Sequence, residues 1–204
     1  MSIQETTQPL PVTFSPLLRH YTLEEFWALP EPPDRARYEL IEGTLIMTPP
    51  PDPPHGSIDA RLADALHRFL ISHNIAGEVH HPREPIYING TYLEPDMMYV
   101  SHELRARMGA CRTSADIVFE YLSKSTAAYD RTTKADTYLA LGVRELWLVD
   151  PDAVSIEVRR AHPANGGTPL PHWERVISTA GQWAESRVLA GWRVAVDMVF
   201  AGLV

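Results

Sequence analysis

The chain has 204 residues, a mass of 22.9 kDa and a formal net charge of −8 at pH 7. Its length suits one domain with a proper core, and its 45% hydrophobic and 22% charged residues exclude wholesale disorder. The acidic charge argues against a general nucleic-acid coat protein, but not against a nuclease, because metal ions can neutralise phosphates locally.

Neither a membrane span nor a secretory signal is visible in the sequence. No apolar run approaches the ~20 residues that a span needs, and Gln4, Glu5 and Gln8 stand where a signal would be basic and then apolar. We therefore expect a cytoplasmic protein without a membrane partner. Cys111 is the only cysteine, which excludes an intrachain disulfide and a multi-cysteine zinc site.

The N-terminal part predicts an arm, a short helix and a hairpin. We expect an extended arm over residues 1–20 and a single domain over 21–204. Thr22 and Glu25 fit a capping box, so a helix should cover residues 23–28 and turn three apolar side chains to the core, those of Leu23, Phe26 and Trp27. The Glu42-Gly43 pair between two apolar runs predicts a β-hairpin over residues 37–47.

A proline-rich loop and an amphipathic helix follow. Residues 48–56 contain five prolines, which remove hydrogen-bond donors and predict a stiff loop. From Ser57 on, Ile58, Leu62, Leu66 and Phe69 recur at helical spacing, so this helix should face the core.

The second half alternates strands and helices. Residues 79–100 carry two strand-like runs, 83–88 and 92–100, around Asn89-Gly90, a strong hairpin signal. Beyond them we predict a short helix over residues 101–108, capped by Ser101, and a buried strand over 116–122. A helix over 129–141 should follow, and then two strands, 144–149 and 154–160, that form a hairpin. One strand-helix-strand unit among hairpins predicts an α/β fold with a mixed sheet flanked by helices.

Glu120 is the anomaly in the buried strand. An ionised carboxylate is rarely buried unless a partner, such as a metal, offsets its desolvation. Asp96 follows Pro95 in the preceding strand-like run, and Lys134 lies on the next helix. Such a triplet suits metal-dependent phosphodiester cleavage: Asp96 and Glu120 would hold Mg²⁺ or Mn²⁺ with the Phe119 or Tyr121 carbonyl, and Lys134 would orient the nucleophile or contact the scissile phosphate.

Several blocks of the sequence together resemble the Uma2 family. They are Tyr38–Gly43, the proline-rich loop ending at His55, Leu93–Asp96, Phe119–Thr126, Asp130 through Lys134 to Tyr138, and Gly142–Pro151. That family looks like a branch of the PD-(D/E)xK nuclease superfamily. The resemblance covers roughly residues 20–200. It implies the restriction-endonuclease-like fold and places Asp96 and Glu120 at the two acids of the superfamily.

The sequence departs from the superfamily pattern at Leu122, where a lysine would stand. Lys134 is the natural replacement, reaching the same space from the helix, and Lys124 is the alternative. Lys134 could instead form a solvated pair with Asp130 one turn earlier. For Asp96 the alternative is an ordinary strand-start carboxylate that pairs with an arginine or accepts backbone N–H groups.

Two further residues are possible accessories. Glu39 could be another ligand, although we expect a solvent-facing strand glutamate. His55, between the proline-rich loop and the helix, is a possible neighbour of the active site. Tyr138 is expected to pack in the core with its hydroxyl group satisfied.

The leading functional hypothesis is a metal-dependent DNA endonuclease. A nuclease-fold module that binds nucleic acid or protein without catalysis is the alternative, since Leu122 replaces the lysine. A zinc hydrolase ranks last, because no H-x-x-x-H or H-E-x-x-H spacing occurs. Exposed sheet edges and five tryptophans would suit a homodimer.

Overall fold

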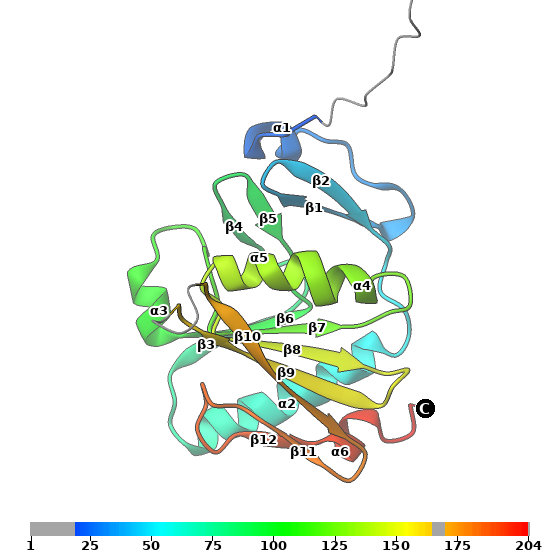
Figure 1. The fold of residues 1–204 in the computed structure, drawn as a ribbon, viewed down its shortest axis with the longest axis vertical. Helices are drawn as coiled ribbons and strands as arrows, with labels where there is room; N and C mark the ends of the chain where they lie inside the picture. The colour runs from blue at the N-terminus through cyan, green and yellow to red at the C-terminus, as the bar shows by residue number, and fades with distance from the viewer. Residues whose placement is uncertain (1–18, 165–169, 204) are drawn as a thin grey trace, which may run out of the picture.

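The computed structural model describes residues 19–164 and 170–203. Its centre is a six-stranded sheet with the order β10-β9-β8-β7-β6-β3 (Figure 1). The strands are β3 (Gly77–His80), β6 (Met97–Ser101), β7 (Ile117–Tyr121), β8 (Glu145–Asp150), β9 (Ser155–His162) and β10 (His172–Thr179). β7 and β8 are parallel and the other neighbours are antiparallel. The predicted mixed sheet is confirmed.

A helical crossover joins β7 to β8, as parallel neighbours require. It consists of α4 (Ala127–Tyr129), the π-helical η2 (Asp130–Lys134) and α5 (Ala135–Ala140), and it covers one face of the sheet (Figure 1). The prediction of a strand-helix-strand unit is confirmed. The π-helical turn inside the helix was not foreseen.

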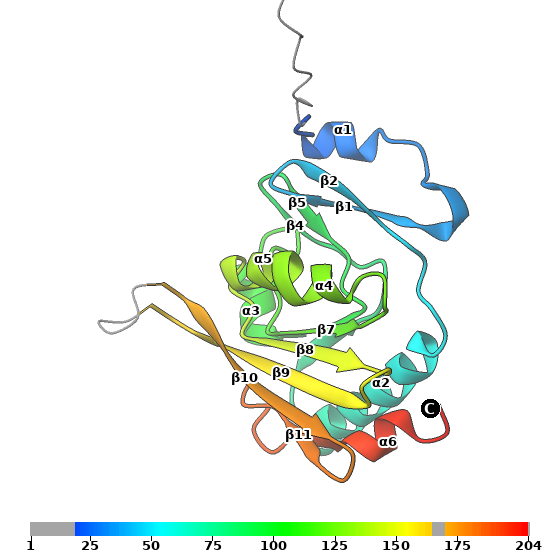
Figure 2. The same ribbon diagram turned by 45° about the vertical axis from the view of Figure 1, so that its right-hand side comes forward.

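The opposite face of the sheet carries the larger apolar core. α2 (His55–Ser72), α6 (Val196–Phe200) and the two-stranded sheet of β11 (Trp183–Glu185) and β12 (Arg193–Ala195) pack there (Figure 2). Ile58, Leu62 and Leu66 are fully buried against the strands, which confirms the predicted amphipathic helix. Phe119, Trp147 and Trp192 form an aromatic cluster in this core, with ring centroids 4.9–6.0 Å apart.

A second sheet lies beyond the crossover helix, with the order β2-β1-β5-β4 (Figure 1). Its strands are β1 (Arg37–Ile41), β2 (Thr44–Thr48), β4 (Ile86–Ile88) and β5 (Thr91–Leu93). Both predicted hairpins are confirmed. Their turn residues Glu42, Gly43, Asn89 and Gly90 all have positive φ, the conformation that tight hairpin turns require.

The prediction of one strand over residues 92–100 is wrong. The run ends as β5 at Leu93 and resumes as β6 at Met97, so Glu94, Pro95 and Asp96 lie between two sheets. Pro95 has no N–H group to donate to a ladder, which favours a break there. β3 and α6 were missed, because both are too short for their periodicity to stand out.

The remaining elements are short. α1 (Leu23–Trp27) has the predicted capping box, and α3 (His102–Arg107) begins at the predicted cap, Ser101. The 3₁₀ turn η1 spans Pro33–Arg35. Of the three α1 side chains expected in the core, Phe26 is buried but Trp27 is 58% exposed.

The predicted arm falls mostly on residues 1–18, outside the described part. The single-domain boundary stays a prediction. Across residues 19–164 and 170–203, none of the helices has the length and apolar character needed to cross a membrane.

Candidate active site

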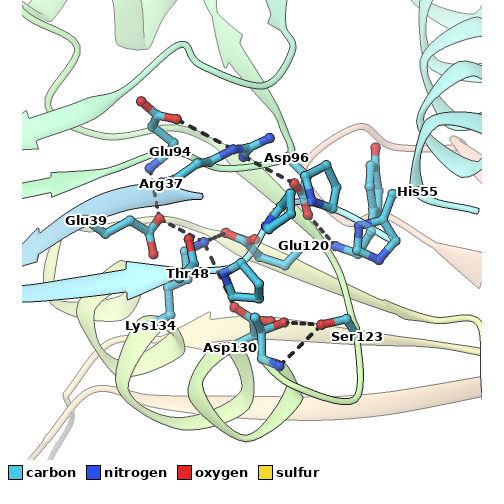
Figure 3. A pocket seen from close by; sticks show the side chains of 15 residues that line it. Arg37, Glu39, Thr48, His55, Glu94, Asp96, Glu120, Ser123, Asp130 and Lys134 are labelled. Carbon is cyan, nitrogen blue, oxygen red and sulfur yellow. Dashed lines mark hydrogen bonds and ion pairs between the residues drawn. The ribbon is translucent and has the colours of Figure 1, made fainter. Parts of the chain in front are cut away.

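A pocket lies where the two sheets, the crossover helix and the proline-rich loop meet (Figure 3). Its lining includes five carboxylate side chains and two fixed cations: Glu39, Glu94, Asp96, Glu120 and Asp130, with Arg37 and Lys134. Three prolines of the loop, Pro49–Pro51, form part of its wall. Negative charge therefore exceeds positive charge in this pocket, although its carboxylates are largely removed from water.

Asp96 lies at the break between β5 and β6. Its Oδ2 accepts a hydrogen bond of 2.8 Å from the Tyr121 backbone N–H, and its Oδ1 lies 3.7 Å from an Arg37 guanidinium nitrogen. Burial raises the pKa of Asp96, while Lys134, the Tyr121 N–H and Arg37 oppose that shift. Both ordinary contacts considered for Asp96, an arginine and a backbone N–H, are thus present alongside its place in the pocket.

Glu120 projects from β7 and is 3% exposed. Its Oε1 accepts a 2.6 Å hydrogen bond from the Tyr138 hydroxyl group and lies 2.9 Å from Lys134 Nζ. Burial raises the pKa of Glu120 well above its ordinary value, Lys134 opposes the shift, and repulsion from Asp96 and the other acids adds to it. Glu120 thus lacks enough positive charge nearby to compensate for its burial.

Lys134 reaches this group from η2, on the helix side (Figure 3). Its Nζ lies 2.9 Å from Glu120, 3.0 Å from Glu39 and 4.0 Å from Asp130. Burial alone would lower the pKa of Lys134, but attraction by these carboxylates outweighs burial and raises it well above the ordinary value. Lys134 is therefore an ammonium ion at neutral pH.

The π-helical turn places Asp130 in the pocket as well. Asp130 and Lys134 are each only 4% exposed, so the alternative of a solvated pair between them is wrong. Burial raises the pKa of Asp130 to about 6, against the attraction of Lys134. A π-helical turn widens a helix locally and often marks a functional site. Here it carries both Asp130 and Lys134, its two buried charged residues.

Glu39 was expected to face solvent, and that expectation is wrong. The side chain is 1% exposed, because both faces of β1 are covered. Its Oε1 contacts Lys134 and accepts the Glu94 backbone N–H at 3.1 Å, and its Oε2 accepts the Tyr129 hydroxyl group at 3.0 Å. Glu39 is thus a member of the buried charged cluster.

His55 begins α2 and lines the pocket. Its Nε2 lies 3.3 Å from the Leu122 carbonyl oxygen, and its ring meets that of Tyr121 edge to face at 6.1 Å. A carbonyl only accepts, so Nε2 carries the proton in this contact. The buried Nδ1 has no hydrogen-bond partner among the described residues.

The two lysine alternatives separate clearly. Lys124 does not line the pocket of Asp96 and Glu120, but a neighbouring hollow with Ser123 and Asp152. Leu122 is 2% exposed and packs in the apolar cluster on the Glu120 side of β7, beside Val118 and Leu148. The position where the superfamily has a lysine is therefore filled by apolar packing, and the one ammonium that reaches Glu120 belongs to Lys134.

Not every contact in and around the pocket was identified from the sequence. Arg37 lies two residues before Glu39, and alternation along a strand puts both on the same face, which was an available signal. Tyr138 was expected to pack in the core with its hydroxyl group satisfied; it is buried, and the hydroxyl group bonds to Glu120. The contact of Tyr129 with Glu39 had no sequence signal, because the two are distant in the chain.

The pocket has a donor set that suits a hard divalent cation. In residues 19–164 and 170–203 no three His, Cys, Asp or Glu side chains are arranged to hold a metal on their own. Mg²⁺, however, is usually held by one or two carboxylates, with waters and substrate phosphates completing its shell. Asp96 and Glu120 provide two carboxylates, and the cavity of about 40 Å³ has room for an ion with a few waters.

Comparisons with known proteins bear on the family and the fold. The model of the Uma2 family, described as "Putative restriction endonuclease", matches residues 23–197. The fold is similar to the crystal structure of a "putative nuclease belonging to DUF820" from Anabaena variabilis ATCC 29413, with a TM-score of 0.71 and 21% identity, covering 90% of this chain and 99% of that chain. At that identity the likeness concerns the fold alone. No curated protein matches the chain.

Proposed function

The chain belongs to the Uma2 family, and from this premise we propose that it is a metal-dependent endonuclease that hydrolyses phosphodiester bonds in DNA. The family description supports a nuclease; the metal and the DNA substrate are the proposal. The observation that carries it is the convergence of Asp96, Glu120 and Lys134 in one pocket, from three separate parts of the chain.

Asp96 and Glu120 would hold Mg²⁺ or Mn²⁺. The backbone carbonyl of Tyr121 is the better third ligand, since Tyr121 lines the pocket and Phe119 does not. Polarisation of the phosphoryl oxygen and a lowered pKa of a bound water are the chemistry that such a cation supplies. The surplus of buried carboxylates supports this assignment, because a dication would offset the burial that raises the pKa of both acids.

Lys134 would act as the fixed positive charge of the site. Its ammonium group is held by Glu120 and Glu39, so it is oriented before substrate binds. An ammonium ion preorganised in a water-poor pocket stabilises negative charge that develops on a transferring phosphoryl group. Lys134 would thus take the role of the superfamily's strand lysine, whose position Leu122 occupies in this chain.

A non-catalytic module is the second candidate. Leu122 and the close pairing of Lys134 with two glutamates favour it, because a lysine so engaged could serve only to neutralise buried acids.

The homodimer also stays a prediction, which light scattering on the purified chain would check.

The test is DNA cleavage by the purified chain. Plasmid and single-stranded oligonucleotides are incubated with Mg²⁺, with Mn²⁺ or with EDTA, beside a Glu120→Gln variant whose folding is checked by circular dichroism. We expect cleavage that needs the metal and falls by at least about 10²-fold in the variant. Equally intact DNA with both proteins, or equal cleavage by both, would refute the proposal.

A further inference from the structure

A second hollow of about 210 Å³ adjoins the pocket of Asp96 and Glu120, which is the catalytic pocket of the proposed function. It lies between α1, the segment from Leu29 to Arg37, and the second sheet, and it shares Arg37 and Glu94 with the catalytic pocket. We call it the aromatic pocket. Through these two shared residues it is continuous with the wall that holds Asp96.

Aromatic side chains supply much of the lining of the aromatic pocket. Phe26 and Tyr92 line it with ring centroids 4.8 Å apart and ring planes tilted by 42°. Trp27 also lines it, and its ring meets that of Tyr87, just outside the lining, edge to face at 5.9 Å. Trp27 is 58% exposed, so much of the indole is open to a ligand. An exposed tryptophan beside other aromatic rings can serve as a platform on which a nucleobase stacks.

The charge of the aromatic pocket is opposite to that of the chain. Arg35, Arg37 and Arg83 line it with only Glu31 and Glu94, whereas the chain carries −8. Within the part of the chain that the structure describes, no carboxylate pairs with Arg35 or Arg83, and the Arg37 contacts are long, 3.7 and 3.9 Å. Three arginines thus have donors to offer to an anion.

The backbone conformation at two of these arginines also supports a binding role. Arg35 and Arg83 have φ values of 61° and 77°, in the left-handed region that costs a non-glycine residue free energy. Such conformations recur where a ligand is clamped. They support a binding role beside the charges and the rings.

From these features we propose that the aromatic pocket binds one unpaired nucleotide of a DNA strand, next to the phosphodiester bond that lies at Asp96 and Glu120. The base stacks on Trp27, and Arg35 and Arg83 contact the backbone phosphates. This inference rests on the proposed function and names its substrate class, which is single-stranded DNA or DNA with an unpaired segment. In a duplex each base is stacked and paired, so its face reaches Trp27 only after costly extrusion.

Fluorescence anisotropy tests the subsite without any cleavage. A labelled single-stranded oligonucleotide and its blunt duplex are titrated with the full chain in EDTA. We expect the single strand to bind more tightly than the duplex, and Trp27→Ala to weaken it roughly 5- to 150-fold. The matched control is Trp183→Ala: Trp183 is 51% exposed and stacks on Arg193 at 4.7 Å. β11, which carries it, lies at the opposite end of the molecule from α1 (Figure 1).

The arginines are tested by salt dependence. A double change, Arg35→Ala with Arg83→Ala, should flatten the slope of log K against log salt by about 1.4 for the single strand, since each phosphate contact contributes about 0.7. The control pair, Arg187→Ala with Arg193→Ala, removes two exposed arginines on the far side and should leave the slope unchanged.

The outcomes separate the subsite from the nuclease proposal. Binding that depends on Trp27 but never leads to cleavage with Mg²⁺ or Mn²⁺ would refute the nuclease and keep the subsite. Cleavage that depends on Glu120, with equal binding by the Trp27→Ala and Trp183→Ala variants, would refute the subsite and keep the nuclease. Equal or tighter binding of the duplex would also overturn the subsite.

Discussion

Glu120 and Glu145 are two buried glutamates on neighbouring parallel strands, and they differ in the polar groups that surround them. Glu145 is 1% exposed and surrounded by donors. It accepts the Arg187 and Val188 backbone N–H groups at 2.5 and 3.2 Å, the Ser186 hydroxyl group at 2.7 Å and the Trp147 indole N–H at 3.2 Å. These bonds satisfy the carboxylate and tie the segment after β11 to the central sheet.

Glu120 has two polar partners, the Tyr138 hydroxyl group and Lys134, and both use the same oxygen. Its other neighbours in the cluster are acids, which repel it. Burial of a carboxylate is therefore not in itself a sign of function. A buried carboxylate surrounded by hydrogen-bond donors stabilises the fold, whereas one surrounded by other acids favours the binding of a cation.

The largest expected effect is on activity. Glu120→Gln keeps the shape of the side chain and removes its charge, so we expect cleavage to fall about 10³-fold, equivalent to about 4 kcal/mol. Glu145→Gln should leave the rate per folded molecule within about threefold, since Glu145 does not line the pocket. Initial rates on a labelled oligonucleotide, corrected for folded fraction, measure both. Similar losses in the two variants would remove the distinction between them.

Stability should reverse the order of the same two variants. Glu145→Gln turns an amide N–H group toward donors and leaves them unsatisfied, which we expect to cost about 3 kcal/mol. Glu120→Gln removes both the repulsion by the other acids and the attraction to Lys134, and because these changes oppose each other the free energy of unfolding should change by about 1 kcal/mol or less. Urea denaturation at pH 7.5 measures both values. A loss for Glu120→Gln as large as that for Glu145→Gln would contradict the account.

A third buried acid, Asp130, should make the stability of the chain depend on pH. Folding raises its pKa from an ordinary 3.8 to about 6, so the folded state binds the proton more tightly and stability falls as pH rises between these values. This cost reaches at most about 3 kcal/mol above pH 6. Asp130→Asn removes it. The variant should therefore be more stable than the wild type at pH 8, with the difference vanishing near pH 4; a difference independent of pH would count against the shift.

The smallest effect is expected at Lys124. Its side chain lies outside the pocket of Asp96 and Glu120, so Lys124→Ala should keep the cleavage rate within about twofold of the wild type. Rates measured as for the Glu120 variant provide the check. A loss comparable to that of Glu120→Gln would show that Lys124, rather than Lys134, supplies the positive charge.

Local signals in the sequence were sufficient for much of the fold. The capping box at Thr22, the Asn89-Gly90 turn and the apolar spacing of α2 act within one element, so each could be predicted without knowledge of the rest. The strand-helix-strand unit could be predicted from the same local patterns, and together with the hairpins it led to the prediction of a mixed sheet. Glu120 was noticed as a carboxylate in a buried strand and Asp96 through its place after Pro95, and the family resemblance then placed both at the two acids of the superfamily.

What could not be predicted depends on contacts between distant segments. Glu39 is buried only because the second sheet packs over the crossover helix, and nothing near residue 39 indicates this. The π-helical turn at Asp130 has no pattern of its own in the sequence. Trp27 looked like a core residue by its spacing, but the short helix α1 turns it outward.

Titration of the chain with Mn²⁺ by calorimetry measures whether the acids around Glu120 bind a divalent cation. We expect one binding site in the wild type and in Glu145→Gln, with affinity at least about tenfold weaker in Asp96→Asn and in Glu120→Gln. No Mn²⁺ binding to the wild type, or equal binding by all four proteins, would contradict this expectation.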